Sequence, residues 1–217
     1  MMNKLRTDCK KVFKEAYEKR YTWPESFSGY KGKCLYLEDD KNFEGDFCLD
    51  SSFKPIVNNI HNEDIKKNIS SQLFEVAIHR VRRDFNSIHS KNDFKFLGES
   101  QLGINMQVIG KNEGDKYIVK NNKINMVYRN IHGFIVEIFV QEFLDTGLGF
   151  LSTKYTSQQI DKDNLKPLSG KFKYHDNFIN LEGNDLWVLE SRKIEFLDKN
   201  KNMKCCQYLF KDLTQIK

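Results

Sequence analysis

The sequence predicts an α+β fold, in which a strongly curved antiparallel sheet, half-barrel or barrel-like, packs against an N-terminal helix and one long helix. Three observations lead to this prediction. The 217 residues include 17 Phe and 9 Tyr but only two alanines, and aromatic side chains fit a pleated sheet better than alanine does. One long segment repeats apolar residues at helical spacing. Many short strand-like segments follow it, separated by turn signals.

The first predicted element is an amphipathic helix over residues 3–21. Its apolar residues recur at helical spacing, and lysines occupy the opposite face. The apolar stripe consists of Leu5, Cys9, Val12, Phe13 and Ala16. The helix should stop before Pro24, because the residue that precedes a proline is disfavoured in the helical region.

Three short strands are predicted next. Residues 30–37 and 43–49 predict a β-hairpin around the turn segment EDDKN. Residues 53–60 predict a third strand, which should lie at a sheet edge or contain a bulge because Pro55 has no N–H to donate.

The long helix is predicted over residues 63–88, where two adjacent apolar stripes give a wide buried face. Asn62 is the expected N-cap, since its side chain can accept a hydrogen bond from an N–H group of the first turn. Glu63 and Asp64 suit the positive end of the helix dipole.

The rest of the chain, residues 94–210, predicts about eight strands. Two of them, residues 123–131 and 134–143, carry apolar residues on both faces. A sheet with one covered face should alternate, so we expect the concave side to be filled by the long helix, by aromatic side chains or by a ligand. Without an internal repeat or a low-complexity linker, residues 1–217 are predicted to form a single domain.

Cysteine usage and charge limit the function classes. The five cysteines lack CxxC spacing, which argues against a zinc site, and their odd number favours free thiols. The first residues have no apolar signal core, so a cytoplasmic location is expected. Residues 1–21 and 199–217 each carry a net charge of +4. Basic ends fit peripheral contact with an anionic membrane, whereas a nucleic-acid partner, which needs basic charge over the body, is not expected.

The connector after the first helix is unusually aromatic for a loop. Tyr21, Trp23 and Tyr30 are candidates for the rim or lid of a ligand pocket, because they offer a broad apolar surface with one polar group each. The alternative is that the connector packs as a plug over the end of the sheet.

Two motifs carry candidate cations. HRVRR, residues 79–83, places cationic groups about one helical turn apart. Arg82 and its neighbours could hold a carboxylate or phosphate through guanidinium hydrogen bonds. Structural ion pairs with Glu75, Asp84 or Asp93 are the alternative.

The second motif, RNIHG, lies at a predicted tight turn between the two apolar strands. Arg129 should point to the same side as apolar neighbours, so it needs a partner such as Glu137, Glu142 or a ligand's acidic group. His132 is a further candidate, although a general base needs a nucleophile or a second acid within hydrogen-bond reach.

Catalytic signatures are missing from the sequence. It contains no GxGxxG after a strand, no P-loop, no GxSxG and no HExxH. The sequence therefore assigns no catalytic residue, no cofactor and no metal ligand, and it favours a role other than catalysis.

Four long stretches carry a resemblance that spans most of the chain. They are AYEKRYTWPESFSGYKG (16–32), LFEVAIHRVRRDF (73–85), GDKYIVKNNKINMVYRNIHG (114–133) and DTGLGFLSTKYTSQ (145–158). With their RYTW, HRVRR and RxIHG motifs, they resemble an uncharacterised protein family of oxygenic phototrophs, namely cyanobacteria and plastids. The order of elements is also similar to the half-barrel carriers that move lipoproteins across the periplasm, a similarity of architecture that does not imply function.

The resemblance implies a role in the photosynthetic apparatus. The leading hypothesis is a non-catalytic binding or assembly protein whose curved sheet holds a lipid, a carotenoid or a tetrapyrrole, with a photosynthetic protein complex as a further partner. The ligand-binding candidates are Tyr21, Trp23 and Tyr30 at the mouth, and Arg82, Arg129 and His132 at the polar end.

Two alternatives remain open. The first is an enzyme of the lyase or isomerase type that acts on a bilin or another pigment, in which Cys34, Cys48 or His132 would need a neighbouring acid or base. The second is a protein-interaction module without a ligand.

Overall fold

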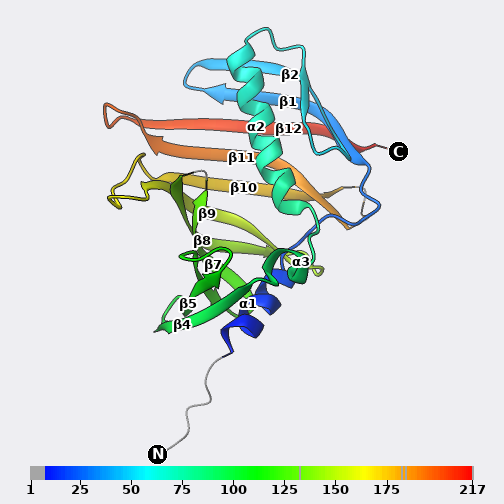
Figure 1. Cartoon of the computed structure of the whole chain (residues 1–217). Coiled ribbons are helices and arrows are strands. Elements are labelled where there is room, and N and C mark those ends of the chain that lie inside the picture. The colour runs from blue at the N-terminus through cyan, green and yellow to red at the C-terminus, as the bar shows by residue number, and fades with distance from the viewer. Residues whose placement is uncertain (1–7, 132, 182, 184, 217) are drawn as a thin grey trace, which may run out of the picture.

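Twelve strands form one open antiparallel sheet in the computed structural model, which describes residues 8–131, 133–181, 183 and 185–216. The strands are β1 (Gly29–Glu38), β2 (Lys41–Asp50), β3 (Ile56–Asn58), β4 (Asn92–Ser100), β5 (Gly103–Gly110), β6 (Lys116–Lys120), β7 (Lys123–Ile131), β8 (Phe134–Asp145), β9 (Phe150–Asp161), β10 (Phe172–Leu181), β11 (Leu186–Leu197) and β12 (Met203–Gln215). The helices are α1 (Cys9–Glu18), α2 (Glu63–Arg80) and α3 (Phe85–His89). A large curved sheet with few helices confirms the predicted α+β class (Figure 1).

The strand order is β3-β2-β1-β12-β11-β10-β9-β8-β7-β6-β5-β4. Most neighbours in the sheet are therefore neighbours in sequence, apart from β1 and β12, which pair near the two ends of the chain. The chain runs from β3 at one edge to β4 at the other through α2, which lies across the face turned toward the viewer in Figure 1. We call the face that carries α2 the inner face.

The first part of the chain follows the sequence predictions in the order of its elements, but α1 is shorter than the predicted helix over residues 3–21. It begins after Asp8, whose carboxylate accepts the N–H of Lys11 (3.0 Å), and ends at Glu18, whereas residues 3–7 lie outside the described residues. β1 and β2 form the predicted hairpin, and β3, which follows Pro55, lies at the edge of the sheet. Asn62 is confirmed as the N-cap of α2.

α2 is shorter than predicted, because it ends at Arg80 and does not continue to residue 88. The main-chain N–H of Trp23 donates to the carbonyl of Arg80 (2.8 Å), and Val81 adopts an extended conformation. The break allows Phe85, at the start of α3, to pack with α1 in a second core. None of the helices in the described ranges has the length and apolar character of a transmembrane span.

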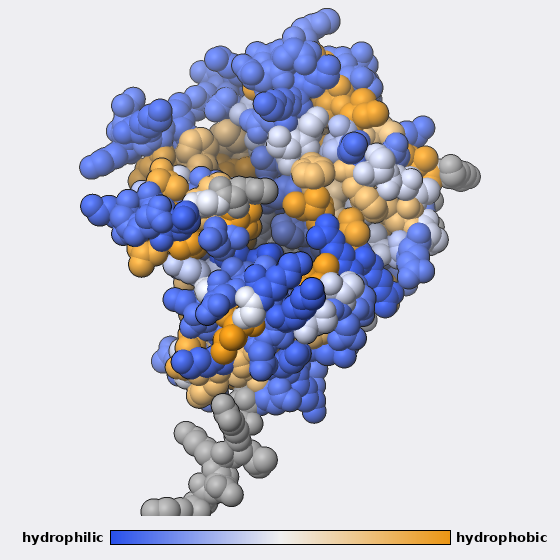
Figure 2. All heavy atoms as spheres, viewed as in Figure 1, coloured by the Kyte–Doolittle hydropathy of each residue, from blue (hydrophilic) through white to orange (hydrophobic). Residues whose placement is uncertain are grey.

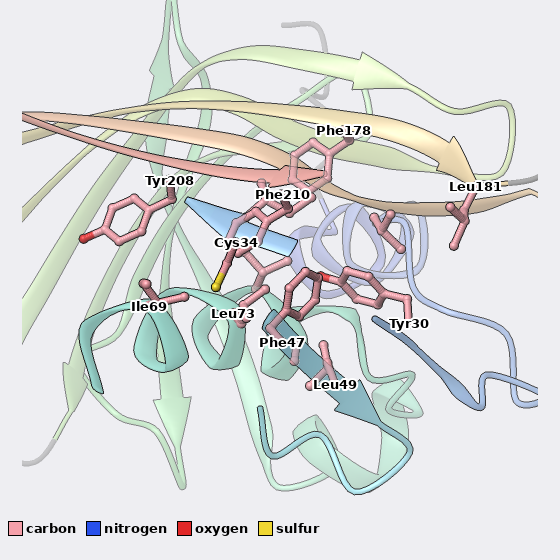
Figure 3. Packing of buried hydrophobic residues seen from close by; sticks show 14 of the residues in the cluster. Tyr30, Cys34, Phe47, Leu49, Ile69, Leu73, Phe178, Leu181, Tyr208 and Phe210 are labelled. Carbon is pink, nitrogen blue, oxygen red and sulfur yellow. The ribbon is translucent and has the colours of Figure 1, made fainter. Parts of the chain in front are cut away.

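Two separate hydrophobic cores lie on the inner face. The α2 core lies between α2 and the strands β1–β3 and β10–β12. Figure 3 shows Ile69 and Leu73 of α2 directed toward sheet residues such as Cys34 and Phe210. The α1 core lies between α1, α3 and the strands β4–β6, with the ring of Phe13 near its centre. The two cores stabilise opposite halves of the sheet.

Candidate functional site

The middle of the inner face, formed by β7, β8 and β9, lies between the two cores. The register places Val127 opposite Ile138, and Val140 opposite Tyr155, so these side chains share one face. Val127 packs at the edge of the α1 core, and Tyr155 hydrogen-bonds with Arg192 beside α2. We define the inner strip as Val127, Ile131, Val136, Ile138, Val140 and Tyr155.

Every residue of the inner strip is only half-buried. By contrast, Leu73 of the α2 core has no exposed surface. α2 and aromatic side chains pack on the strands at one side of the strip, and α1 packs on the strands at the other side. Figure 1 shows the two helices over different parts of the sheet. Figure 2 shows apolar residues around a recess between these two parts. The strip is therefore a partly open apolar surface, and the register places the polar side chains of Ser157 and Gln159 on the same face, beside Ile138 and Val136.

α2 presents a polar stripe to the inner face. Its members, at helical spacing, are Asn68, Gln72, Glu75 and His79. The hydroxyl of Tyr208 donates to Asn68 (2.9 Å), and Arg192 donates to Gln72 (2.9 Å) and lies 3.4 Å from the carboxylate of Glu75. His79 is the last member of this stripe, one turn beyond Glu75.

Arg192 on β11 is a buried charge with a complete set of partners. Its guanidinium donates to both carboxylate oxygens of Asp176 (2.8 and 2.7 Å) and to the hydroxyl of Tyr155 (2.8 Å). It also lies over the ring of Tyr174, 5.3 Å from the centroid. Together with Gln72 of α2, these contacts attach the helix to the sheet through a buried bidentate pair.

Arg80, at the end of α2, is a cation without a carboxylate partner in the described residues. Its Nε is buried and has no hydrogen-bond partner among them. One Nη donates a long hydrogen bond to the carbonyl of Tyr21 (3.4 Å), and the guanidinium lies over the ring of Phe178 (5.5 Å). The carboxylate of Asp176 is already bonded to Arg192. Burial lowers the pKa of Arg80 to about 10.

Arg20 and His79 lie close to Arg80. Arg20 donates to the carbonyl of Tyr17 (3.0 Å) and lies over its ring (3.7 Å). His79 keeps part of its surface open to solvent. Enclosure by the protein, and then the positive charges of the neighbouring arginines, lower the pKa of His79 to about 4. Arg80 and Arg20 create a positive potential at the α2 end of the inner strip, whereas His79 is neutral at neutral pH.

Arg129 has a partner that the sequence did not predict. Its Nε lies 3.1 Å from the buried carboxylate of Asp115, which precedes β6, so neither Glu137 nor Glu142 is its partner. Burial raises the pKa of Asp115. The side chain of Arg129 remains 42% exposed and lies on the same face as Val136 of the inner strip.

The aromatic connector between α1 and β1 is packed into the α2 core. This arrangement resembles the alternative in which the connector packs as a plug, and not an open rim or lid. Tyr21, Trp23 and Tyr30 are 1%, 2% and 0% exposed. The hydroxyl of Tyr21 donates to the carbonyl of Asp185 and accepts the N–H of Trp187, both at 2.8 Å. The indole of Trp23 donates to the carbonyl of Trp187 (2.9 Å). The hydroxyl of Tyr30 has no partner among the described residues.

The remaining candidates are spread apart. Arg82 is exposed in the segment between α2 and α3, and His132 lies outside the described residues. The structure thus brings Tyr21, Trp23 and Tyr30 into one core and places Arg129 beside the inner strip. It brings Arg80 and Arg20, rather than Arg82, to the end of that strip.

The cysteines that an enzyme acting on a pigment would use show no arrangement with a neighbouring acid or base among the described contacts. All five cysteines are unpaired. Cys34 lies in the α2 core, and burial raises the pKa of its thiol to about 11, so the thiol stays protonated at neutral pH. Cys48 is half-buried on β2. Among the described residues, no group of three or more His, Cys, Asp or Glu is arranged to hold a metal ion.

Sequence reasoning missed Arg192 and Asp176, although a signal was present. On β11, Arg192 has the same parity as the buried residue Ile194, and on β10, Asp176 has the same parity as Tyr174. A charged residue at an apolar parity on each of two neighbouring strands is typical of a buried pair.

Two open grooves lie over β10–β12, mainly on the face that points away from α2. The larger one extends to residues 142–144 of β8 and to residues 153–154 of β9. The volumes of the grooves are about 520 and 750 Å³, and both are lined by Ser191 and Leu209. These two residues are register partners, whereas the next pair, Arg192 and Tyr208, points toward α2. The larger groove reaches Phe178 because β9 and β10 stop pairing after His175. The grooves are distinct from the inner strip.

Comparison with protein families gives one match. A family described as "Protein of unknown function (DUF3386)" matches residues 4–216, and the chain therefore belongs to that family. No curated protein matches the chain.

Solved structures give weak matches to the fold. A LolA superfamily protein from Nitrosomonas europaea is 7% identical, with 97% of this chain and 94% of that chain covered and a TM-score of 0.27. A chain of the MucA/MucB complex from Pseudomonas aeruginosa is 8% identical, with 92% and 90% covered and a TM-score of 0.25.

Proposed function

We propose that this member of the DUF3386 family binds an apolar or amphipathic molecule along the inner strip and does not act on it chemically. The observation that carries the proposal is the half-buried apolar surface of β7 and β8, with Tyr155 of β9, between two well-packed cores. Burial of apolar surface contributes about 25 cal/mol per Å², so a chain that covers about 200 Å² of the strip would gain about 5 kcal/mol. A surface of this kind favours a ligand with a long apolar part.

The sequence candidates take different parts in this proposal. Arg129, beside the strip, would contact a polar group of the ligand, and the same role for His132 and Arg82 remains a prediction. Tyr21 and Trp23 would act indirectly, because their main-chain groups contact the last residue of α2. Tyr30 would act only as a buried packing residue of the α2 core.

The biological setting is also part of the proposal. We propose a lipid, carotenoid or tetrapyrrole of the photosynthetic apparatus as the ligand, supported by the sequence resemblance of residues 16–32, 73–85, 114–133 and 145–158 to a family of oxygenic phototrophs. A cytoplasmic location and a photosynthetic complex as partner are likewise proposed. Residues 1–217 are proposed to form a single domain, supported by the continuity of the sheet from β3 to β4.

The test is native mass spectrometry, combined with an absorption spectrum, of protein purified without detergent from a phototrophic host. We expect an added mass that is lipid-like or coloured. The variant Ile138→Asp, which places a charge in the strip, should lose that mass, since an unpaired charge next to a hydrocarbon chain is strongly unfavourable.

The matched control is Gln207→Asp, on the opposite face of the sheet, which should keep the added mass. An added mass that survives Ile138→Asp, or an absence of any added mass in all three proteins, would contradict the proposal.

A further inference from the structure

We infer that the ligand carries an anionic group, a carboxylate or a phosphate, at one end of its apolar part, and that Arg80 with Arg20 binds this group at the α2 end of the inner strip. The inference rests on the proposed function and names the class of ligand for the same site. It makes the ligand an amphipathic acid and not a neutral hydrocarbon.

The first observation is an excess of positive charge. Arg20, His79, Arg80, Arg129 and Arg192 are close enough for the four arginines to act electrostatically on His79. Asp115 neutralises Arg129, and Asp176 with Glu75 neutralises Arg192. No carboxylate of the described residues lies within salt-bridge distance of Arg20 or Arg80. The four arginines and three carboxylates leave this cluster with a net charge of +1, and the guanidinium groups of Arg20 and Arg80 are the two without a salt bridge among the described residues.

The second observation is unsatisfied hydrogen-bonding capacity. A guanidinium has five N–H donors. Arg80 uses one of them in a 3.4 Å bond to Tyr21, while its Nε is buried without a partner in the described chain. The buried hydroxyl of Tyr30 also has none, and it lies within the electrostatic reach of Arg80 and Arg192. Buried donors without partners are unfavourable, and an anion would satisfy them.

The third observation is that Arg80 is held in place. Trp23 donates to its main-chain carbonyl (2.8 Å), Tyr21 accepts from its guanidinium, and Phe178 lies under the guanidinium plane. Tyr21 and Trp23 are themselves fixed by hydrogen bonds to Asp185 and Trp187. A donor that is already ordered loses little entropy when a ligand binds. The aromatic connector thus positions the cation and does not itself need to touch the ligand.

Competition with a neutral fluorescent reporter tests the inference. The reporter is N-phenyl-1-naphthylamine, and the competitors share a dodecyl chain but end in a phosphate, a carboxylate, a hydroxyl or a trimethylammonium group, all below their micelle concentrations. We expect the phosphate and the carboxylate to displace the reporter at about tenfold to one-hundredfold lower concentration than dodecanol, since hydrogen bonds to charged groups contribute about 1.5–3 kcal/mol. Their relative affinity tells which of the two anions is preferred.

Three variants separate the inference from the proposed function. Arg80→Gln should abolish the preference for anions and leave dodecanol and the reporter within about twofold of their wild-type affinity. Arg80→Lys should retain part of the preference, because it keeps the charge but loses the planar donor set. The control Lys173→Gln removes an exposed cation from a β10 position of opposite parity to Tyr174 and should change nothing.

Two results have different consequences. Binding of the reporter and dodecanol without a preference for anions, or a preference that Arg80→Gln leaves intact, would overturn the inference and leave the proposed function standing. Failure of the reporter and of every competitor to bind would overturn both.

Discussion

The strands under α2 and the middle strands β7–β9 belong to the same sheet. They differ in how far their apolar side chains are buried and in whether the nearby charged side chains have partners. Under α2, Leu73 is fully buried and Arg192 has a bidentate carboxylate partner. In the middle, Ile138 is half-buried, and Arg80 at the adjoining end of α2 has no carboxylate in the described chain. The strands under α2 therefore have the features of a stabilising core, and β7–β9 have the features of a binding surface. Exposed apolar groups and unpaired donors contribute little to folding but remain available to a ligand.

The largest expected effect is at Arg192. Arg192→Met would leave the buried carboxylate of Asp176 without its counter-charge and should lower the free energy of unfolding by about 3–5 kcal/mol. Urea unfolding followed by circular dichroism measures this change. Lys193→Gln, next in sequence and facing the other way, removes only a partly exposed pair with Glu195 and should cost about 1 kcal/mol or less. Equal effects at the two positions would contradict the role assigned to the buried pair.

Truncation of apolar side chains compares the two regions directly. Leu73→Ala should destabilise the protein by about 2–5 kcal/mol, because a cavity forms in a filled core. Ile138→Ala, in the inner strip, should cost only about 1 kcal/mol, since its side chain is already partly hydrated. The measurement is the same urea titration. An Ile138→Ala loss as large as that of Leu73→Ala would mean that the strip is part of a core.

The α1 core should show a pH dependence that originates from His89. Its ring packs against Phe13 and Phe85, its Nδ1 lies 3.1 Å from Asn92, and burial lowers its pKa to about 4. An unfolded histidine has a pKa of about 6.5, so below that value only the unfolded chain takes up the proton. Stability from this group is therefore full above about pH 6.5 and falls as the pH decreases to about 4, by about 2–3 kcal/mol.

The comparison of wild type with His89→Gln isolates this contribution, because the carboxylates that titrate in the same range are common to both proteins. We expect the difference in the free energy of unfolding between the two proteins to change over this interval and to be constant above it. A constant difference across the whole range would show that His89 does not contribute.

The smallest expected effect is at Arg80, and its contrast with Arg192 is the informative point. Arg80→Met replaces a charge that has no carboxylate partner in the described chain. The free energy of unfolding of the ligand-free protein should therefore fall by no more than about 1 kcal/mol, and a rise is also consistent with an unpaired charge. A loss as large as that of Arg192→Met would mean that Arg80 is satisfied by the fold itself.

Parts of the fold that depend on local chemistry could be predicted from the sequence. The hairpin, the edge position of β3 after Pro55 and the N-cap at Asn62 each follow from the residue type at one place. The end of α2 could not be predicted in this way, because it depends on the contact between Trp23 and Arg80, which are 57 positions apart in the sequence. Nearly helical periodicity continued into α3 and concealed the break.

The candidate site depends on three-dimensional arrangement to a greater extent. The apolar residues on both faces of β7 and β8 correctly indicated an unusual region, but which helix covers which strands depends on the curvature of the sheet. The partner of Arg129 was missed because Asp115 lies just before the neighbouring strand β6, in a segment that the sequence predicts as a turn. HRVRR was recognised as a cationic motif, yet only the structure distinguishes Arg80, at the end of the strip, from the exposed Arg82.

Photochemical labelling is the most direct way to find out whether the inner strip is the ligand surface. A long-chain alkyl diazirine without a charged group would be irradiated with the protein, and the labelled peptides would be identified by mass spectrometry. If the inner strip binds the ligand, the label should lie within residues 127–131 and 134–140 and at Tyr155, and excess dodecanol should reduce it. Labelling confined to residues 142–144, 153–154, 177–179 and 207–213, which include most of the lining of the two grooves, would contradict this assignment.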